Sequence, residues 1–198
     1  MSLQDFKTTK SSDNSQSRES KANTRECPSC GSEYKMIGNH WGNTCSYPKM
    51  NKHQLDIVKG SILGDGTLRQ SKLSSYPQLS IGMRNKKYLE HIQDIFNPLT
   101  AGVNRNNNCF QIATTPHPSL NDLKWDVGPK TNIPKGIDVN PTILKHWFVQ
   151  DGGLDWANQD ASIQICSGTF DLDRIATILQ GIGIDGTPLT NRVRVSQH

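Results

Sequence analysis

Two aspartates, each followed directly by glycine at the end of an expected helix, are the residues of this sequence best placed to do chemistry. Asp65 follows the segment VKGSILG, and Asp151 follows LKHWFVQ 86 residues later. In both places the glycine permits the backbone turn that ends a helix. Two carboxylates fixed at neighbouring helix ends suit Mg²⁺, which keeps water and phosphate oxygens as its other ligands. Such a site would serve phosphodiester hydrolysis, in which metals activate water and neutralise the leaving oxygen.

The repetition of this Asp-Gly pair favours a function over an ordinary turn. A single Asp-Gly at a helix end is most often only a C-cap. Here the pair occurs twice, in matching places of a repeated order of elements. If the two helices pack side by side, their ends bring both carboxylates to one point.

The segments around each acid follow one order of elements, which is helix, strands, helix, strands. Apolar residues recur at helical spacing in 55–63, 86–96, 141–151 and 170–180. They alternate as in strands in 77–84, 109–113, 161–166 and 192–195, and shorter extended pieces are expected near 67–69 and 123–127. The sequence therefore predicts an α+β fold of two pseudo-symmetric αββαββ repeats, over residues 53–139 and 140–198.

A cysteine-rich segment precedes the repeats and predicts a separate small module over residues 25–52. Cys27, Cys30, His40 and Cys45 form the pattern Cys-x2-Cys-x9-His-x4-Cys. Three thiols and one imidazole are the soft ligands of a closed tetrahedral zinc site, and so short a segment cannot form a core without metal. Unrelated reduced thiols are the alternative, and His53 is an alternative ligand to His40. Residues 1–24 are polar and are expected to be disordered.

Composition excludes several classes of protein. No apolar run of the 198 residues is long enough to span a bilayer, and the N-terminus lacks the apolar region of a signal peptide. We therefore expect a soluble intracellular protein, cytoplasmic or organellar. Five cysteines without a secretory signal argue against disulfides, and Cys109 and Cys166, in expected strands, are expected to be buried core residues. The net charge of +4 is compatible with phosphate contacts.

The sequence is similar to the LAGLIDADG homing endonucleases. KGSILGDGTL resembles their first motif, and IPKGIDVNPTILKHWFVQDGG resembles the second motif of intron and intein endonucleases. ASIQICSGTFDLDRIATILQGIGI resembles the strand and helix that follow. This resemblance covers residues 56–195. It implies that the motif helices form the central interface and that two saddle-shaped antiparallel sheets contact the major groove of double-stranded DNA.

The resemblance also implies roles for the residues of the two motifs. Asp65 and Asp151 would bind Mg²⁺ or Mn²⁺ at the scissile phosphates of the two strands, with the carbonyls of Gly64 and Gln150 as secondary ligands. Two copies in one chain imply a monomeric enzyme that cuts an asymmetric site.

Accessory residues follow from the same resemblance. Lys130 and Gln78 are candidates for the loosely fixed catalytic Lys and Gln of the family. Recognition of base edges and phosphates is expected from donors and amides of the first repeat. These candidates for DNA contact are Arg69, Gln70, Lys72, Gln78, Arg84 and Gln111.

The sequence departs from the family pattern in three places. His146 stands where the first copy has the small Gly60, which predicts a looser approach of the two helices. Gln150 stands where many relatives carry Asp. After 192–195 the family continues with more strand and often a helix, so the end at His198 predicts a truncated copy with reduced stability or activity.

Three other functions compete with this interpretation. An RNA maturase or DNA-binding regulator on the same scaffold would not need both acids. An HNH-type nuclease, indicated by Asn39-His40 beside cysteines, would need a second histidine on a following helix and usually a second Cys-x2-Cys. A zinc-dependent interaction module with an unrelated α+β domain would leave the duplicated Asp-Gly helices unexplained.

Overall fold

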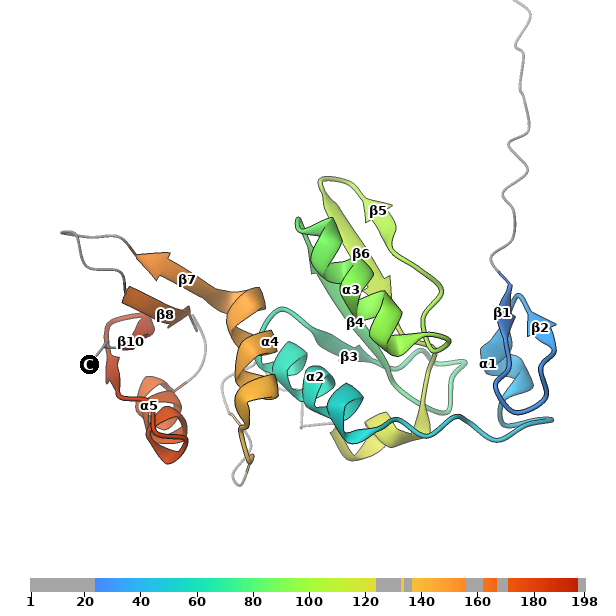
Figure 1. The fold of residues 1–198 in the computed structure, drawn as a ribbon, viewed down its shortest axis with the longest axis horizontal. Helices are drawn as coiled ribbons and strands as arrows, with labels where there is room; N and C mark the ends of the chain where they lie inside the picture. The colour runs from blue at the N-terminus through green and yellow to red at the C-terminus, as the bar shows by residue number, and fades with distance from the viewer. Residues whose placement is uncertain (1–23, 124–132, 134–136, 156–161, 167–170, 196–198) are drawn as a thin grey trace, which may run out of the picture.

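Two four-stranded antiparallel sheets lie on either side of a central pair of helices in the computed structural model of this chain (Figure 1). The structure describes residues 24–123, 133, 137–155, 162–166 and 171–195. The predicted disordered tail thus lies outside the described residues, apart from Thr24. Among the described residues no helix is long and apolar enough to cross a membrane.

Both repeats have the same order of elements and the same sheet topology. The first comprises α2 (Lys52–Leu63), β3 (Thr67–Arg69), β4 (Gln78–Met83), α3 (Lys86–Phe96), β5 (Asn104–Asn106), β6 (Cys109–Ala113) and the 3₁₀ helix η1 (Pro118–Leu123). The second comprises α4 (Pro141–Asp151), β7 (Gly152–Asp155), β8 (Ser162–Cys166), α5 (Leu172–Gly181), β9 (Gly186–Pro188) and β10 (Arg192–Val195). The sheets have the orders β3-β4-β6-β5 and β7-β8-β10-β9, so the predicted αββαββ pseudo-symmetry is confirmed.

Several short strands differ from the prediction. β5, β7 and β9 were not recognised as segments, because three or four residues rich in Gly, Asn and Pro show no alternation. Gly152 does end α4, yet its extended backbone leads directly into β7. The strand predicted near 123–127 is wrong at its start, because Leu123 closes η1, and the rest lies outside the described residues.

The helix pair α2 and α4 packs so closely that two glycines are required on α2. A Cβ added to Gly60 would lie 2.5 Å from the carbonyl oxygen of Ile143 and 2.9 Å from the Cβ of His146. A Cβ added to Gly64 would lie 2.7 Å from the Cβ of Gln150. The looser approach predicted from His146 is therefore wrong, because the glycine opposite it leaves room for the larger side chain.

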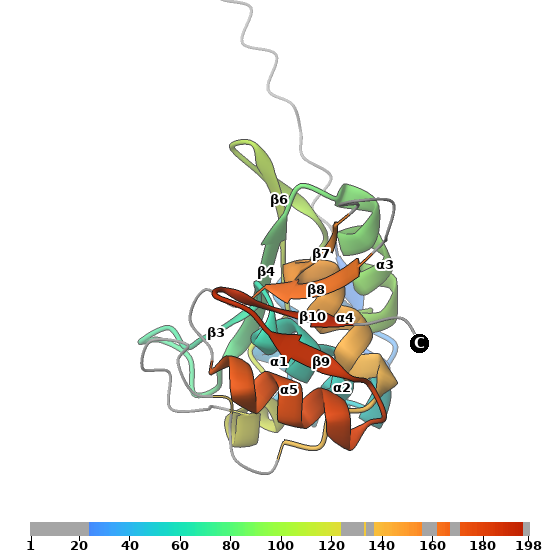
Figure 2. The same cartoon turned by 90° about the vertical axis from the view of Figure 1, so that its left-hand side faces the viewer.

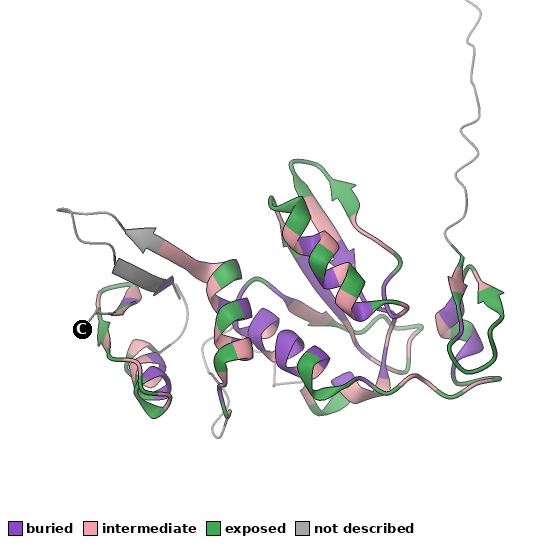
Figure 3. Ribbon diagram, in the orientation of Figure 1, coloured by how far each residue is buried: buried purple, intermediate pink, exposed green. Residues whose placement is uncertain are grey.

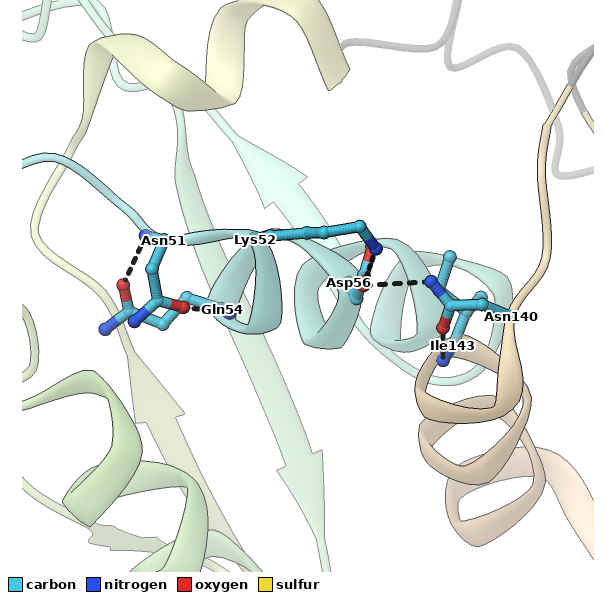
Figure 4. A network of polar contacts seen from close by, with 6 residues as sticks. All are labelled: Asn51, Lys52, Gln54, Asp56, Asn140 and Ile143. Atoms are coloured by element: carbon cyan, nitrogen blue, oxygen red, sulfur yellow. Dashed lines mark hydrogen bonds and ion pairs between the residues drawn. The ribbon is translucent and has the colours of Figure 1, made fainter.

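The other end of this helix pair is joined by a buried carboxylate (Figure 4). Asn140 caps α4 by accepting from the backbone N–H of Ile143, and its amide donates to Asp56 of α2 at 2.9 Å. Lys52 also pairs with Asp56 at 2.7 Å. Burial raises the pKa of Asp56, but these two donors outweigh it and hold the pKa below its usual value. Capping and interhelix contact are thus made by one asparagine.

Two hydrophobic cores lie on either side of α2 and α4. Ile57 and Val58 of α2 belong to the first core, whereas Leu63 of the same helix packs with Trp147 in the second. Figure 3 shows α2 buried over much of its length. In Figure 2 the second repeat faces the viewer, with α5 packed beside β9 and β10. The motif helix of the first repeat therefore stabilises both halves.

The N-terminal segment is packed on the first repeat. It contains β1 (Arg25–Glu26), β2 (Glu33–Tyr34) and the single turn α1 (Ile37–His40). Ile37, Trp41 and Met50 are buried in the same core as the α2, β4 and α3 side chains. This segment is therefore joined to the repeat by a shared core.

The close approach of the helices predicts the effect of a single methyl group at Gly60. Gly60→Ala would force overpacking against the backbone of Ile143, and we expect it to lower the free energy of unfolding by about 1–3 kcal/mol. Gly181→Ala is the control, because a Cβ there would have no atom within 4 Å. Urea denaturation followed by circular dichroism measures both. Equal stability of the two variants would contradict the close contact.

Candidate functional site

The two predicted catalytic acids directly follow two residues that touch each other between α2 and α4. Gly64 and Gln150 touch across the interface, and each directly precedes one acid, Asp65 or Asp151. The contact of Gly60 with His146 has the same offset of 86 residues as that of Gly64 with Gln150. The helices therefore pack in parallel with equivalent positions opposed, and the next equivalent pair along them is the two aspartates.

The surroundings of the two acids differ in exposure. Asp65 is exposed directly after Gly64, the residue that caps the C-terminus of α2, and Asp151 is the half-buried last residue of α4. The turn that carries Asp65 is closed by a hydrogen bond from the N–H of Gly66 to the carbonyl of Ser61 at 2.7 Å. Carboxylate and carbonyl oxygens at the end of two helices are hard ligands that fit a divalent cation such as Mg²⁺ or Mn²⁺.

A buried hydrogen-bond network stands directly behind Asp151. The side-chain amide of Gln150 donates to the hydroxyl of Ser61 on α2 at 2.9 Å and to that of Tyr88 on α3 at 3.0 Å. The Tyr88 hydroxyl is also 2.7 Å from Nδ1 of His146. Three helices are thus linked through the residue that precedes Asp151.

The protonation states of this network follow from its burial. Burial, together with the nearby cation Lys145, lowers the pKa of His146 to about 4, so the imidazole is neutral at neutral pH. Burial raises the pKa of Tyr88 to about 12, and the phenol stays protonated although the hydrogen bond from Gln150 opposes the shift. Both groups are therefore neutral, and the phenol oxygen accepts from Gln150 while the hydroxyl shares a hydrogen bond with Nδ1 of His146.

Sequence reasoning missed Tyr88 and the role of Gln150. Tyr88 is one of several apolar positions on α3, and its spacing gives no sign that its hydroxyl reaches α4. The only signal was the departure at Gln150, where many relatives carry an acid. The buried Oε1 of Gln150 accepts no hydrogen bond from the described residues, so the two donations of its amide hold the side chain in place.

The polar face of the first sheet collects three of the predicted DNA-contacting residues. Arg69 pairs with Gln78 across β3 and β4, and Gln111 pairs with Gly82 across β4 and β6. All three alternate with buried Leu79, Ile81 or Ile112 and so lie on the opposite face. Gln111 also donates to the hydroxyl of Ser80 at 2.7 Å.

The other predicted accessory residues lie at the rim of this sheet or outside the described residues. Gln70 and Lys72 are exposed in the β3–β4 loop, and Arg84 is exposed directly after β4. Gln78, predicted as accessory to catalysis, is the first residue of β4. Lys130 lies outside the described residues.

The second sheet presents arginines that the sequence reasoning did not select. Val193 is fully buried and pairs with buried Ile165. Arg192 and Arg194, on either side of Val193 in β10, therefore lie on the opposite, polar face. The alternation Arg-Val-Arg-Val in the sequence was the signal that could have identified them.

The predicted zinc ligands come together at the N-terminal segment. The ligand atoms of Cys27, Cys30, His40 and Cys45 all lie within 4.8 Å of one another. The donor set of three sulfurs and one imidazole nitrogen fits a tetrahedral zinc ion. His53, the alternative ligand, is exposed on α2 and is not part of this group.

The pKa values of two thiols in this cluster are shifted in opposite directions. Burial would raise the pKa of Cys27, but the hydrogen bond from the Trp41 indole at 3.4 Å and backbone donors lower it to about 6. Burial and the neighbouring thiols raise the pKa of Cys45 to about 11. A divalent cation would offset the repulsion among the sulfurs, because metal ligation requires the thiolate form.

The expectation that Cys109 is a buried core residue is wrong. Cys109 begins β6 next to the β5–β6 turn, where all three β5 residues are exposed, and it is exposed itself. Cys109 is two residues from Gln111 in β6, so both side chains lie on the polar face of the sheet. The side chain of Cys166 lies outside the described residues.

Known proteins resemble this chain in sequence and in fold. The sequence model of the LAGLIDADG DNA endonuclease family matches residues 55–185. The DNA endonuclease I-ChuI of Chlamydomonas applanata is 24% identical over 147 residues, which are 61% of this chain and 67% of that protein. The homing endonuclease I-WcaI bound to its DNA recognition sequence has a similar structure, with a TM-score of 0.60 and 18% identity over 78% of this chain and 83% of that one.

The family match spans more than half of the chain and contains both Asp-Gly helix ends, whereas the cysteine cluster precedes it. This chain therefore belongs to the LAGLIDADG DNA endonuclease family.

Proposed function

We propose that this chain is a site-specific, homing-type DNA endonuclease that hydrolyses one phosphodiester bond in each strand of a DNA duplex. The observation that carries the proposal is the contact of Gly64 with Gln150, which places one aspartate of each repeat at the same helix junction. Support comes from the family match and from I-WcaI, a homing endonuclease described with its DNA recognition sequence. A protein that only binds nucleic acid would have no use for both acids there.

In this proposal the side chains of Asp65 and Asp151 bind Mg²⁺ or Mn²⁺. The carbonyl oxygens of Gly64 and Gln150 add further ligands from the same junction. These residues would hold the cation, and the chemistry that it would supply there is the activation of water and the neutralisation of the leaving oxygen. Gln78 and Lys130 remain the candidates for orienting water beside the cation.

The two polar sheet faces serve DNA recognition in this proposal. The first face offers amides such as Gln78 and Gln111 beside Arg69, and the second offers Arg192 and Arg194. Amides suit adenine edges, whereas arginine suits guanine edges and phosphates. Because the two faces differ in chemistry, a single chain would recognise an asymmetric site.

The cysteine cluster is proposed to hold a structural zinc ion. Cys27, Cys30, His40 and Cys45 would fill all four tetrahedral positions, so no position would remain for a reacting water. The indole of Trp41 donates to one of these sulfurs and would orient it. The zinc ion would therefore stabilise the fold of this segment and would take no part in hydrolysis.

Replacement of either acid tests the catalytic proposal. Asp65→Asn and Asp151→Asn each remove one negative ligand at similar volume, and we expect double-strand cleavage to fall by at least about 100-fold. The substrate is a duplex that the unaltered chain cleaves, selected from a randomised pool and carried on a circular plasmid. The assay measures the linear product of double-strand cleavage. Asp122→Asn, an exposed acid in η1, is the control. Unchanged cleavage by both variants would refute the assignment.

Zinc content tests the cysteine cluster. Mass spectrometry of the purified chain should show one zinc ion, and Cys30→Ser should abolish it. Zinc at 100 times its dissociation constant stabilises by about 2.7 kcal/mol, so we expect a comparable loss in urea denaturation. Cys109→Ser is the matched control, because Cys109 is exposed and outside the cluster. Equal zinc content in Cys30→Ser would exclude this site.

Tyr88→Phe tests whether the buried network positions Asp151. The variant removes the hydroxyl that is hydrogen-bonded to His146 and that accepts from Gln150, which costs about 1–3 kcal/mol. We expect slower cleavage of the strand served by Asp151, so that nicked duplex accumulates while the dissociation constant for DNA stays unchanged. Ser61→Ala, which removes the other acceptor of Gln150, should act in the same direction.

A purely structural role for Tyr88 would lower stability without changing the ratio of the two strand cleavage rates. Thr177→Val, which removes an exposed hydroxyl on α5 outside this network, is the control for that ratio. Equal slowing of both strands in Tyr88→Phe would therefore contradict positioning.

A further inference from the structure

A polar cleft of about 410 Å³ lies between the N-terminal cysteine segment and the first repeat. One wall carries Asn39, Asn43 and Tyr47 of the cysteine segment, and the other carries residues 73–76 of the β3–β4 loop. These walls come from parts of the chain about 30 residues apart. The cleft exists only because the segment is docked beside this loop.

The docking of the cysteine segment fixes the shape of the cleft. Arg25 donates to the hydroxyl of Thr115 at 2.9 Å and to the carbonyl of Pro98 at 3.3 Å. A Cβ added to Gly38 would lie 2.6 Å from a methyl group of Thr115, so no slack remains there. Tyr47 meets Tyr76 edge to face, with ring centroids 5.5 Å apart. A preformed cleft binds without the entropic cost of ordering its walls.

The chemistry of the lining fits a sugar–phosphate backbone. Asn39, Asn43 and Ser75 have exposed polar side chains, and the Asn43 amide also donates to the carbonyl of Asn39 at 2.8 Å. None of the described residues that line the cleft is a carboxylate. Asparagine, serine and tyrosine side chains are among the usual partners of DNA phosphates and sugars. Leu73 at the rim is 100% exposed, and such apolar side chains contact thymine methyl groups or base steps in DNA complexes.

The position of the cleft continues the polar face of the first sheet. The loop that forms one wall connects Arg69 to Gln78, the pair at the end of that face. Gln70 donates to the carbonyl of Ser74 at 2.9 Å and so holds this loop. Lys72 precedes Leu73 and brings a positive charge to the rim. Duplex lying on the sheet face would reach the cleft at its flank.

We propose that this cleft binds the sugar–phosphate backbone of target DNA outside the region covered by the two sheets, on the side of the first repeat only. The proposal rests on the proposed endonuclease function and adds a second contact region to it. The zinc-dependent segment then has a specific role, because it forms one wall of the cleft and holds the other wall in place.

Hydroxyl-radical footprinting with the zinc-loaded full chain tests this proposal. The probe is a duplex that the unaltered chain cleaves and that was selected from a randomised pool. It is lengthened at each end by about one turn of the double helix. Asn39→Ala/Asn43→Ala should lose backbone protection at one end alone, with about a tenfold rise in the dissociation constant. On duplexes shortened at that end, variant and unaltered chain should bind equally. Asn39→Asp/Asn43→Asp, of the same shape but negatively charged, should weaken binding further.

Two controls make the outcome decisive. Asn121→Ala/Asn191→Ala alters two exposed asparagines outside the cleft and should leave the footprint unchanged. Zinc content and melting temperature report whether each variant is folded. Loss of protection at both ends, or none at either end, would overturn the cleft proposal while cleavage by the unaltered chain upholds the endonuclease. No cleavage of any duplex by the unaltered chain would overturn both.

Discussion

The contact between α2 and α4 is the constraint on which the rest of this structure depends. Gly60 and Gly64 let the helices approach until backbone meets side chain, and Asn140 joins their other ends through the buried Asp56. Each helix leads into a sheet of its own repeat. The same contact therefore sets the spacing of the acids and the relative placement of the two sheets that would receive DNA.

The pseudo-symmetry of this contact is broken by side-chain size. Glycines on α2 face His146 and Gln150 on α4, so the larger side chains of the second copy fill space that the first copy leaves empty. Those larger side chains then bond to Tyr88 and Ser61, both of the first repeat. The junction behind Asp151 is thus held by three helices, whereas Asp65 stands exposed after a turn. The two half-sites are structurally unequal.

The features that the sequence predicted correctly are those that depend on the spacing of apolar residues, on glycine positions and on short motifs. The paired helices, the αββαββ order and the clustering of the three cysteines with His40 were all anticipated, because they depend on apolar spacing and on short ligand motifs. The network of Tyr88 was not, because it depends on side chains that are distant in sequence meeting across a helix interface. Cys109 was wrongly predicted to be buried for a related reason. Alternation of apolar residues identifies the strand β6, but it does not show that the first residue of this strand lies outside the core.

The cysteine cluster is joined to the hydrophobic core of the first repeat. Cys27 is both a candidate ligand and a member of the first hydrophobic core, with Trp41 buried beside it. Metal binding that orders these residues would therefore also order the surface of the core against which β4 and α3 pack. The same segment is tied by Arg25 to the loop after α3 and to the end of β6. Loss of a metal from this cluster would thus weaken the packing beneath the first sheet, which carries the predicted DNA-contacting residues Arg69, Gln78 and Gln111.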